Sequence, residues 1–136
     1  MFRKLDEQVS VYGQLTPEDV AAARAQGFTA IVNNRPDDEQ PGQPAGDDIA
    51  AAAEAAGVAY TAIPIDHNGF SAAQVSAMVG VLTQESGPIL AFCRSGTRST
   101  FLWALARASV GDDADRLVAK AAAAGYDISP IRPALG

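Results

Sequence analysis

A single cysteine begins a run of residues whose types and spacing suit a nucleophile. Cys93 is the only cysteine in the chain, and it opens the run Cys93-Arg94-Ser95-Gly96-Thr97-Arg98-Ser99. An apolar stretch typical of a strand precedes this run, and an apolar stretch typical of a helix follows it. A loop that ends at a helix N-terminus aims backbone N–H groups and the positive end of the helix dipole at one point. Such a setting favours an anion, and a reactive thiolate is an anion.

The other residues of the run supply groups that bind anions. Arg98 carries a planar fork of donors, which can hold two oxygens of an oxyanion while its charge stabilises the thiolate. Gly96 lets a ring of amides turn inward, because it has no side chain and accepts unusual backbone angles. We therefore predict that Cys93 and Arg98 are catalytic. The predicted substrate-binding residues are Arg94, Ser95, Gly96, Thr97 and Ser99. For Thr97 and Ser99, capping of the following helix is the alternative to hydrogen bonding with the thiolate.

Helices and strands alternate along the chain around this run. Capping residues, Gly stops and apolar stripes predict helices over residues 17–26, 47–57, 71–84 and 112–124, and another after the Cys93 run. Apolar runs predict buried strands at residues 28–32, 58–63 and 89–92, and an irregular tail at the C-terminal end. Such alternation implies an α/β fold in which helices flank a mostly parallel central sheet. We expect residues 1–136 to form one domain.

Three loops are predicted at the carboxyl ends of these strands, where ligands bind in folds of this kind. They comprise residues 33–36, 65–70 and 93–98. In the first loop, Arg35 either adds positive charge at the rim of a pocket or pairs with Asp37 or Asp38. The acidic stretch Asp37-Asp38-Glu39 is predicted to be solvated surface.

The loop at residues 65–70 holds two titratable side chains. Asp66 is either a general acid or a surface carboxylate. His67, the only histidine, is predicted to face solvent. One cysteine and one histidine cannot supply the usual ligand set, so we expect no metal site, and we expect no cofactor.

Charge and hydropathy exclude several kinds of partner. The net charge is -6 and the isoelectric point is near 4.5, whereas nucleic-acid binding needs clustered Lys and Arg. No stretch approaches membrane-spanning length, and acidic residues follow Met1 before any apolar run. We therefore expect a cytoplasmic protein that binds neither nucleic acid nor membrane.

The Cys93 run resembles the active-site loop of single-domain rhodaneses, and the order of elements around it resembles that of cysteine-dependent phosphatases of the dual-specificity type. Both features occur together in bacterial phosphatase-like domains named after a beta-lactamase-hydrolase-like protein. The chain is similar to that family from about Val11 to Ala108. The matching segments are Gly13-Gln14, Asn34-Arg35-Pro36-Asp37, Ile63-Pro64-Ile65 and the Cys93 run.

The resemblance implies a sulfurtransferase, because members of the family occur fused to or encoded beside sulfide-oxidising enzymes. The Cys93 thiolate would take a sulfane sulfur from thiosulfate or glutathione persulfide and pass it to a thiol or cyanide. Phosphatases of the superfamily place one residue more between cysteine and arginine, and they carry histidine where Phe92 stands here. Both departures favour sulfur transfer. The alternative is a phosphatase that forms a Cys93 phosphocysteine, with Asp66 as general acid.

Overall fold

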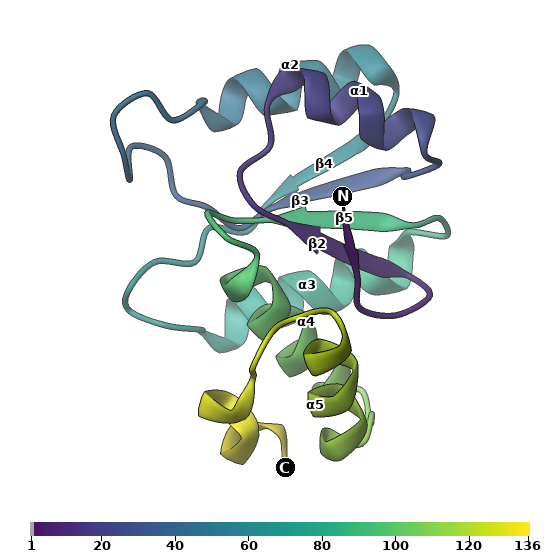
Figure 1. Ribbon diagram of the computed structural model, residues 1–136, viewed down its shortest axis with the longest axis vertical. Coiled ribbons are helices and arrows are strands. Elements are labelled where there is room, and N and C mark those ends of the chain that lie inside the picture. Colours follow the sequence, from purple (N-terminus) through teal and green to yellow (C-terminus); the bar gives the residue numbers. More distant parts are fainter. Residues whose placement is uncertain (1) are drawn as a thin grey trace.

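Five strands form one sheet in the computed structural model, which describes residues 2–136 (Figure 1). The strands are β1 (Arg3–Lys4), β2 (Val9–Tyr12), β3 (Ala30–Asn33), β4 (Ala59–Ala62) and β5 (Ile89–Phe92). They lie in the order β1-β2-β5-β3-β4. Only β1 runs antiparallel to its neighbour, and the remaining pairs are parallel. The predicted mostly parallel sheet is therefore confirmed.

Helices cover both faces of this sheet. The helices are α1 (Pro17–Ala25), α2 (Gly46–Ala56), α3 (Ala72–Gln84), α4 (Thr97–Ser109) and α5 (Ala114–Ala123), and a 3-10 helix, η1, spans Ser129–Leu135. Figure 1 shows α1 and α2 on one side of the sheet, and α3, α4 and α5 on the other. This is the layered arrangement that helix–strand alternation predicts.

Alternating side chains of the central strand β5 divide the hydrophobic core between these two faces. Leu90 and Phe92 belong to the cluster beneath α1 and α2, whereas Ile89 and Ala91 belong to the cluster beneath α3, α4 and α5. All four side chains have no exposed area. Because each fully buried large apolar side chain contributes roughly 1.5–3 kcal/mol, burial on both faces fixes β5 and therefore the start of the Cys93 loop.

Two helix starts have the capping geometry that their sequences predict. The Thr16 hydroxyl accepts a hydrogen bond from the Asp19 amide, and the Asp19 carboxylate accepts one from the Thr16 amide. Ser71 and Gln74 exchange the same pair of hydrogen bonds at the start of α3. These reciprocal bonds satisfy amides that a helix end would otherwise leave without partners.

The structure departs from the predicted elements at both ends of the chain. Strands β1 and β2 were not predicted, and the tail predicted as irregular contains the 3-10 helix Ser129–Leu135. The helix predicted over residues 112–124 is shorter, because the Asp113 side chain caps its first turn by accepting from the Arg116 amide. Within residues 2–136, no helix combines the length and apolar character needed to cross a bilayer.

Candidate active site

Cys93 directly follows β5 and lies below the N-terminus of α4. Its side chain is buried, with 1% of its area exposed. The sulfur accepts a hydrogen bond from the Gly96 amide, with an N–Sγ distance of 3.1 Å. Gly96 is also the N-cap residue of α4, so the sulfur lies where the helix dipole favours negative charge. The predicted setting for a thiolate is therefore present.

Gly96 has the backbone conformation that its predicted role requires. Its φ angle is +92°, in the left-handed region that side-chain-bearing residues rarely adopt. A Cβ atom at this position would collide with the hydroxyl of Tyr126. Both the angle and the close approach of Tyr126 therefore require glycine here.

The three predicted loops converge at one edge of the sheet. The Asn34 amide donates to the Phe92 carbonyl oxygen (2.8 Å), and the Ile65 amide donates to the Asn34 carbonyl oxygen (2.9 Å). Arg98 Nη1 in turn donates to the carbonyl oxygen of Ile65 at 2.7 Å. These bonds link the segments that follow β3, β4 and β5, and they confirm that the carboxyl ends of these strands meet at the Cys93 loop.

The Arg98 guanidinium is held by an acidic residue that the sequence did not single out. Nη1 donates to Glu39 Oε2 at 2.8 Å, and Nη2 donates to Glu39 Oε1 at 2.9 Å. The prediction that the stretch containing Glu39 is merely solvated surface was wrong for this residue. Its neighbour Asp37 has a structural role as well, because its carboxylate accepts from the Gly46 amide at the start of α2.

Arg35 lies behind Glu39 as a second cation. Only 4% of Arg35 is exposed, and its Nε donates to Glu39 Oε1 at 2.9 Å. Its Nη1 donates to Gln14 Oε1 and its Nη2 to Gln40 Oε1. The predicted pairing with Asp37 or Asp38 was wrong, because the partner is the next residue, Glu39. Arg35 thus acts on the site through Glu39.

The two arginines set the electrostatics of this cluster. Hydrogen bonds from Arg98 first, and from Arg35 second, lower the pKa of Glu39 from 4.5 to about 2, although partial burial opposes the shift. The hydrogen bond with Glu39 raises the pKa of Arg98, and the neighbouring Cys93 raises it further. Glu39 is therefore a carboxylate, and Arg98 a cation, at neutral pH.

Gln14 closes a ring of contacts around the Cys93 loop. Its amide donates to the Arg94 carbonyl oxygen at 3.3 Å, and its side-chain oxygen accepts from Arg35. A Cβ atom on the preceding residue, Gly13, would lie 3.0 Å from that same Arg94 oxygen. The ring therefore runs from the loop through Gln14, Arg35 and Glu39 back to Arg98.

The hydroxyls of Ser95, Thr97 and Ser99 make no hydrogen bond to the Cys93 sulfur within residues 2–136. Ser95 Oγ and Thr97 Oγ1 lie 3.1 Å apart and bond to each other. The buried Ser99 hydroxyl has no hydrogen-bond partner among residues 2–136. Neither Thr97 nor Ser99 caps α4, because the N-cap residue is Gly96, which has no side chain to make a capping hydrogen bond. The side chain of Arg94 is exposed at the surface.

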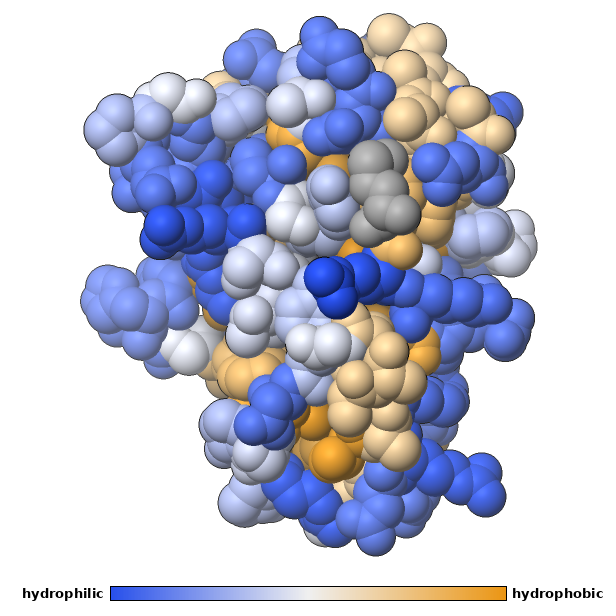
Figure 2. All heavy atoms as spheres, in the orientation of Figure 1, coloured by the Kyte–Doolittle hydropathy of each residue, from blue (hydrophilic) through white to orange (hydrophobic). Residues whose placement is uncertain are grey.

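Asp66 and His67 both lie on the exposed loop after β4. Asp66 Oδ1 accepts from the Asn68 amide at 2.8 Å, and Oδ2 accepts from Asn68 Nδ2 at 3.4 Å. Asp66 directly follows Ile65, whose carbonyl oxygen accepts a hydrogen bond from Arg98. His67 is exposed, as predicted. Figure 2 shows hydrophilic side chains over the loops that surround this edge of the sheet.

Comparison with known proteins places this geometry in a family. The family profile described as "Beta-lactamase hydrolase-like protein, phosphatase-like domain" matches residues 1–110. The chain belongs to this family. A beta-lactamase hydrolase-like protein from Agrobacterium fabrum is 36% identical over 108 residues, which cover 79% of this chain and 25% of that relative. The chain thus spans about a quarter of the length of the Agrobacterium fabrum protein.

Solved structures agree with the assignment to the phosphatase-like domain family. A candidate phosphatase from Neisseria meningitidis is 34% identical, covers 97% of this chain and 94% of its own, and superposes with a TM-score of 0.84. The catalytic core of a PP-IP phosphatase from S. cerevisiae is 10% identical, covers 98% of this chain and 82% of its own, and shares the fold with a TM-score of 0.71. The predicted phosphatase-like architecture is therefore confirmed.

Proposed function

We propose that this chain is a cysteine-dependent phosphatase that acts on phosphomonoesters, with Cys93 as the nucleophile. The observation that carries the proposal is the position of the Cys93 sulfur, which accepts from the Gly96 amide at the N-terminus of α4 beside the guanidinium of Arg98. An amide, a helix dipole and a fixed cation stabilise the thiolate and the negative charge of a bound phosphoryl group. Membership of a phosphatase-like family supports the same chemistry.

The reaction follows two displacement steps at phosphorus. In the first, the Cys93 thiolate forms an S–P bond while the P–O bond to the ester oxygen breaks, and the leaving alkoxide takes a proton from Asp66. In the second, water attacks phosphorus and gives its proton to the Asp66 carboxylate as the S–P bond breaks. Orthophosphate leaves, and the thiolate is restored. Arg98 binds two phosphoryl oxygens in both steps.

The role of Asp66 requires a local change in its hydrogen bonds. Both carboxylate oxygens accept from Asn68, and the side chain is exposed at the loop surface. The proposal therefore requires a turn of the exposed residues 66–68, beyond the point where Arg98 anchors Ile65, that directs Asp66 toward Cys93. Hydrogen bonds that catalysis needs often form only when substrate is bound.

A second candidate function is sulfur transfer, which a specific observation favours. Only four residues separate Cys93 from Arg98, one fewer than in phosphatases of the superfamily. In this reaction, the Cys93 thiolate bonds to the outer sulfur of thiosulfate, and the S–S bond of thiosulfate breaks as sulfite departs with the electron pair. A thiolate or cyanide acceptor then takes that sulfur from the Cys93 persulfide. No general acid is needed, so Asp66 would have no part.

One set of assays distinguishes the two functions. Wild type, Cys93→Ser and Asp66→Asn are each tested for phosphate release from an aryl phosphate and for thiocyanate formation from thiosulfate and cyanide. The proposal expects phosphate release from wild type, none from Cys93→Ser, and no thiocyanate from any variant. Thiocyanate formation that survives in Asp66→Asn, without phosphate release, would reverse the order of the candidates. Equal phosphate release by wild type and Cys93→Ser would overturn the nucleophile assignment.

A further inference from the structure

The peptide group between Ser95 and Gly96 is bound at both of its ends. Its carbonyl oxygen, on Ser95, accepts from the Tyr126 hydroxyl at 3.0 Å. Its amide, on Gly96, donates to the Cys93 sulfur at 3.1 Å. The C=O and N–H of a trans peptide point in opposite directions from one rigid plane. A hydrogen bond at the oxygen therefore decides where the N–H points.

Steric constraints alone do not fix the orientation of this peptide. Rotation of the Ser95–Gly96 plane changes φ of residue 96, and glycine accepts negative and positive φ about equally well. The observed value of +92° is one of several that glycine can adopt. The flipped orientation would turn the N–H away from the sulfur and the carbonyl dipole toward it. The Tyr126 hydroxyl bond disfavours that flip.

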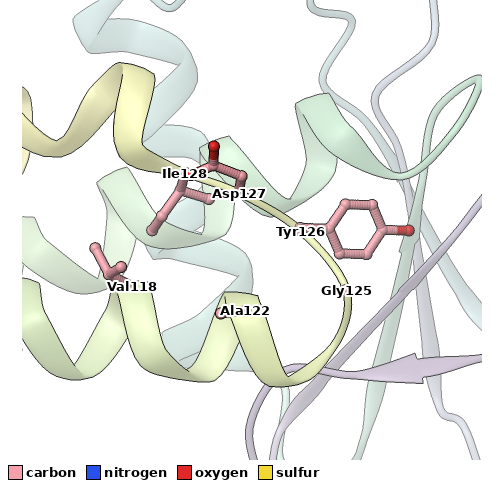
Figure 3. Close-up of a pocket in the computed structure, with 6 residues that line it drawn as sticks. All are labelled: Val118, Ala122, Gly125, Tyr126, Asp127 and Ile128. Atoms are coloured by element: carbon pink, nitrogen blue, oxygen red, sulfur yellow. The ribbon is translucent and has the colours of Figure 1, made fainter.

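Tyr126 reaches the loop from a segment distant in sequence. It follows α5, and its amide donates to the Ala121 carbonyl oxygen at 2.9 Å. In Figure 3 its ring lies beside a cavity of about 400 Å³, and its hydroxyl points away from Val118 and Ile128. Arg3 lies over the ring, 5.8 Å from its centroid. Neither of these contacts involves the Cys93 loop.

The Tyr126 hydroxyl is a proton donor at neutral pH. Burial raises its pKa above the ordinary value of 10, although the charge of Arg3 opposes the shift, and the neighbouring Cys93 adds to the rise. The hydrogen bond from this hydroxyl polarises the peptide, which strengthens the bond that the Gly96 N–H donates on the opposite side.

We propose that Tyr126 is a positioning residue, which orients the Ser95–Gly96 peptide so that its N–H stabilises the Cys93 thiolate. The inference rests on the proposed use of Cys93 as a nucleophile. Tyr126 does not contact the reacting atoms and acts through the peptide alone. It also lies outside residues 1–110, which the family profile matches.

The test measures thiol ionisation directly and needs no substrate. Because Cys93 is the only cysteine, the ultraviolet absorbance of its thiolate can be followed as a function of pH in wild type and Tyr126→Phe. This variant keeps the ring and removes only the hydroxyl. Loss of one hydrogen bond through the peptide should move the midpoint upward by roughly half to one pH unit. The charged groups near the sulfur, Arg98 and behind it Glu39, are the same in both proteins.

Tyr60→Phe is the matched control. Its hydroxyl also takes part in a hydrogen bond, accepting from Asn33 Nδ2 at 3.0 Å, but that bond does not involve the Cys93 loop. We expect its midpoint to equal that of wild type. An unchanged midpoint in Tyr126→Phe, or an equal shift in Tyr60→Phe, would overturn the proposal.

A measurement on the wild-type protein keeps the proposal falsifiable if Tyr126→Phe does not fold. The Gly96 amide should exchange with deuterium as slowly as the amides inside α4, because the peptide is held at both ends. Rapid exchange of Gly96 alone would show that the peptide is free to flip, and the proposal would fail. Neither measurement depends on phosphatase activity. Failure of the proposed function and failure of this inference are therefore distinguishable.

Discussion

Glu39 binds both terminal nitrogens of Arg98, with N–O distances of 2.8 Å and 2.9 Å. This two-point contact fixes the plane of the guanidinium, because a carboxylate and an arginine fork match in geometry. It also leaves Nε and the second hydrogen of Nη2 as the donors available to a substrate, since Nη1 divides its two hydrogens between Glu39 and Ile65. Glu39 therefore decides which edge of Arg98 faces the reaction.

Replacing Glu39 should impair turnover through Arg98. In Glu39→Gln the ion pair is lost and the guanidinium can rotate, so we expect kcat/KM for an aryl phosphate to fall by about tenfold to a hundredfold. Steady-state kinetics measures the change. Glu54→Gln makes the same substitution at an exposed position on α2 and should leave kcat/KM unchanged. Equal kinetics for Glu39→Gln and wild type would mean that Arg98 is held by other contacts.

Acid should weaken the fold through the same carboxylate. The pKa of Glu39 is about 2 in the folded protein, below its ordinary value of 4.5, so the unfolded chain binds more protons between these limits. The stabilisation by Glu39 is complete above pH 4.5 and is lost as the pH falls toward 2. Urea unfolding at pH 7, 4 and 3 measures the free energy of unfolding of wild type and Glu39→Gln. Wild type should be the more stable at pH 7, and the difference should shrink only at the two lower pH values. A difference in unfolding free energy that does not change with pH would contradict the lowered pKa of Glu39.

Alanine at Gly96 should damage the loop in two ways. The residue would adopt φ +92°, which costs about 1 to 3 kcal/mol, and its Cβ would collide with the Tyr126 hydroxyl. We expect a lower melting temperature and loss of phosphate release. Gly80→Ala is the control, because a Cβ at Gly80 in α3 meets nothing within 4 Å, and the change should stabilise the helix by about 0.5–1 kcal/mol. A Gly96→Ala protein as stable and active as wild type would refute this account of the loop.

The general-acid role of Asp66 predicts a dependence on the leaving group. In Asp66→Asn, hydrolysis of an alkyl phosphate should fall by about 10²- to 10⁴-fold, because the alkoxide must be protonated as it departs. Hydrolysis of an ester with a strongly acidic phenol should fall much less. Parallel assays on the two esters measure the contrast. Similar losses for both would assign Asp66 a structural role, through its bonds to Asn68.

The sequence predicts the elements that carry their own local signals. Capping residues mark the starts of α1 and α3, and the apolar run of β5 leads directly into the Cys93 loop. The sequence also predicts that the loops after β3, β4 and β5 lie close together, because the carboxyl ends of parallel strands lie at the same edge of a sheet. Strands β1 and β2 escape prediction, since β1 has two residues and β2 has four that include Ser10. These residues form strands because β2 pairs with β5, which lies far along the chain.

Glu39 and Tyr126 escape prediction because their partners lie elsewhere in the chain. Glu39 is 59 residues from Arg98, and Tyr126 is 31 residues from Ser95. For Glu39 the only local signal is its i,i+4 spacing from Arg35, but residues 35–39 form a loop, where the helix i,i+4 rule does not apply. No comparable signal marks Tyr126, which follows a glycine in a segment without apolar periodicity.

The last helices share the hydrophobic core of the sheet: Leu117, Ala121, Ile128 and Leu135 pack in the same cluster as β5 and α4. Removal of residues 111–136 would therefore expose the apolar side chains of this cluster to water. It would also remove Tyr126, whose hydroxyl binds the Ser95 carbonyl oxygen in the Cys93 loop. Residues 111–136 therefore belong to the same folded unit as the Cys93 loop, although the family profile ends at residue 110.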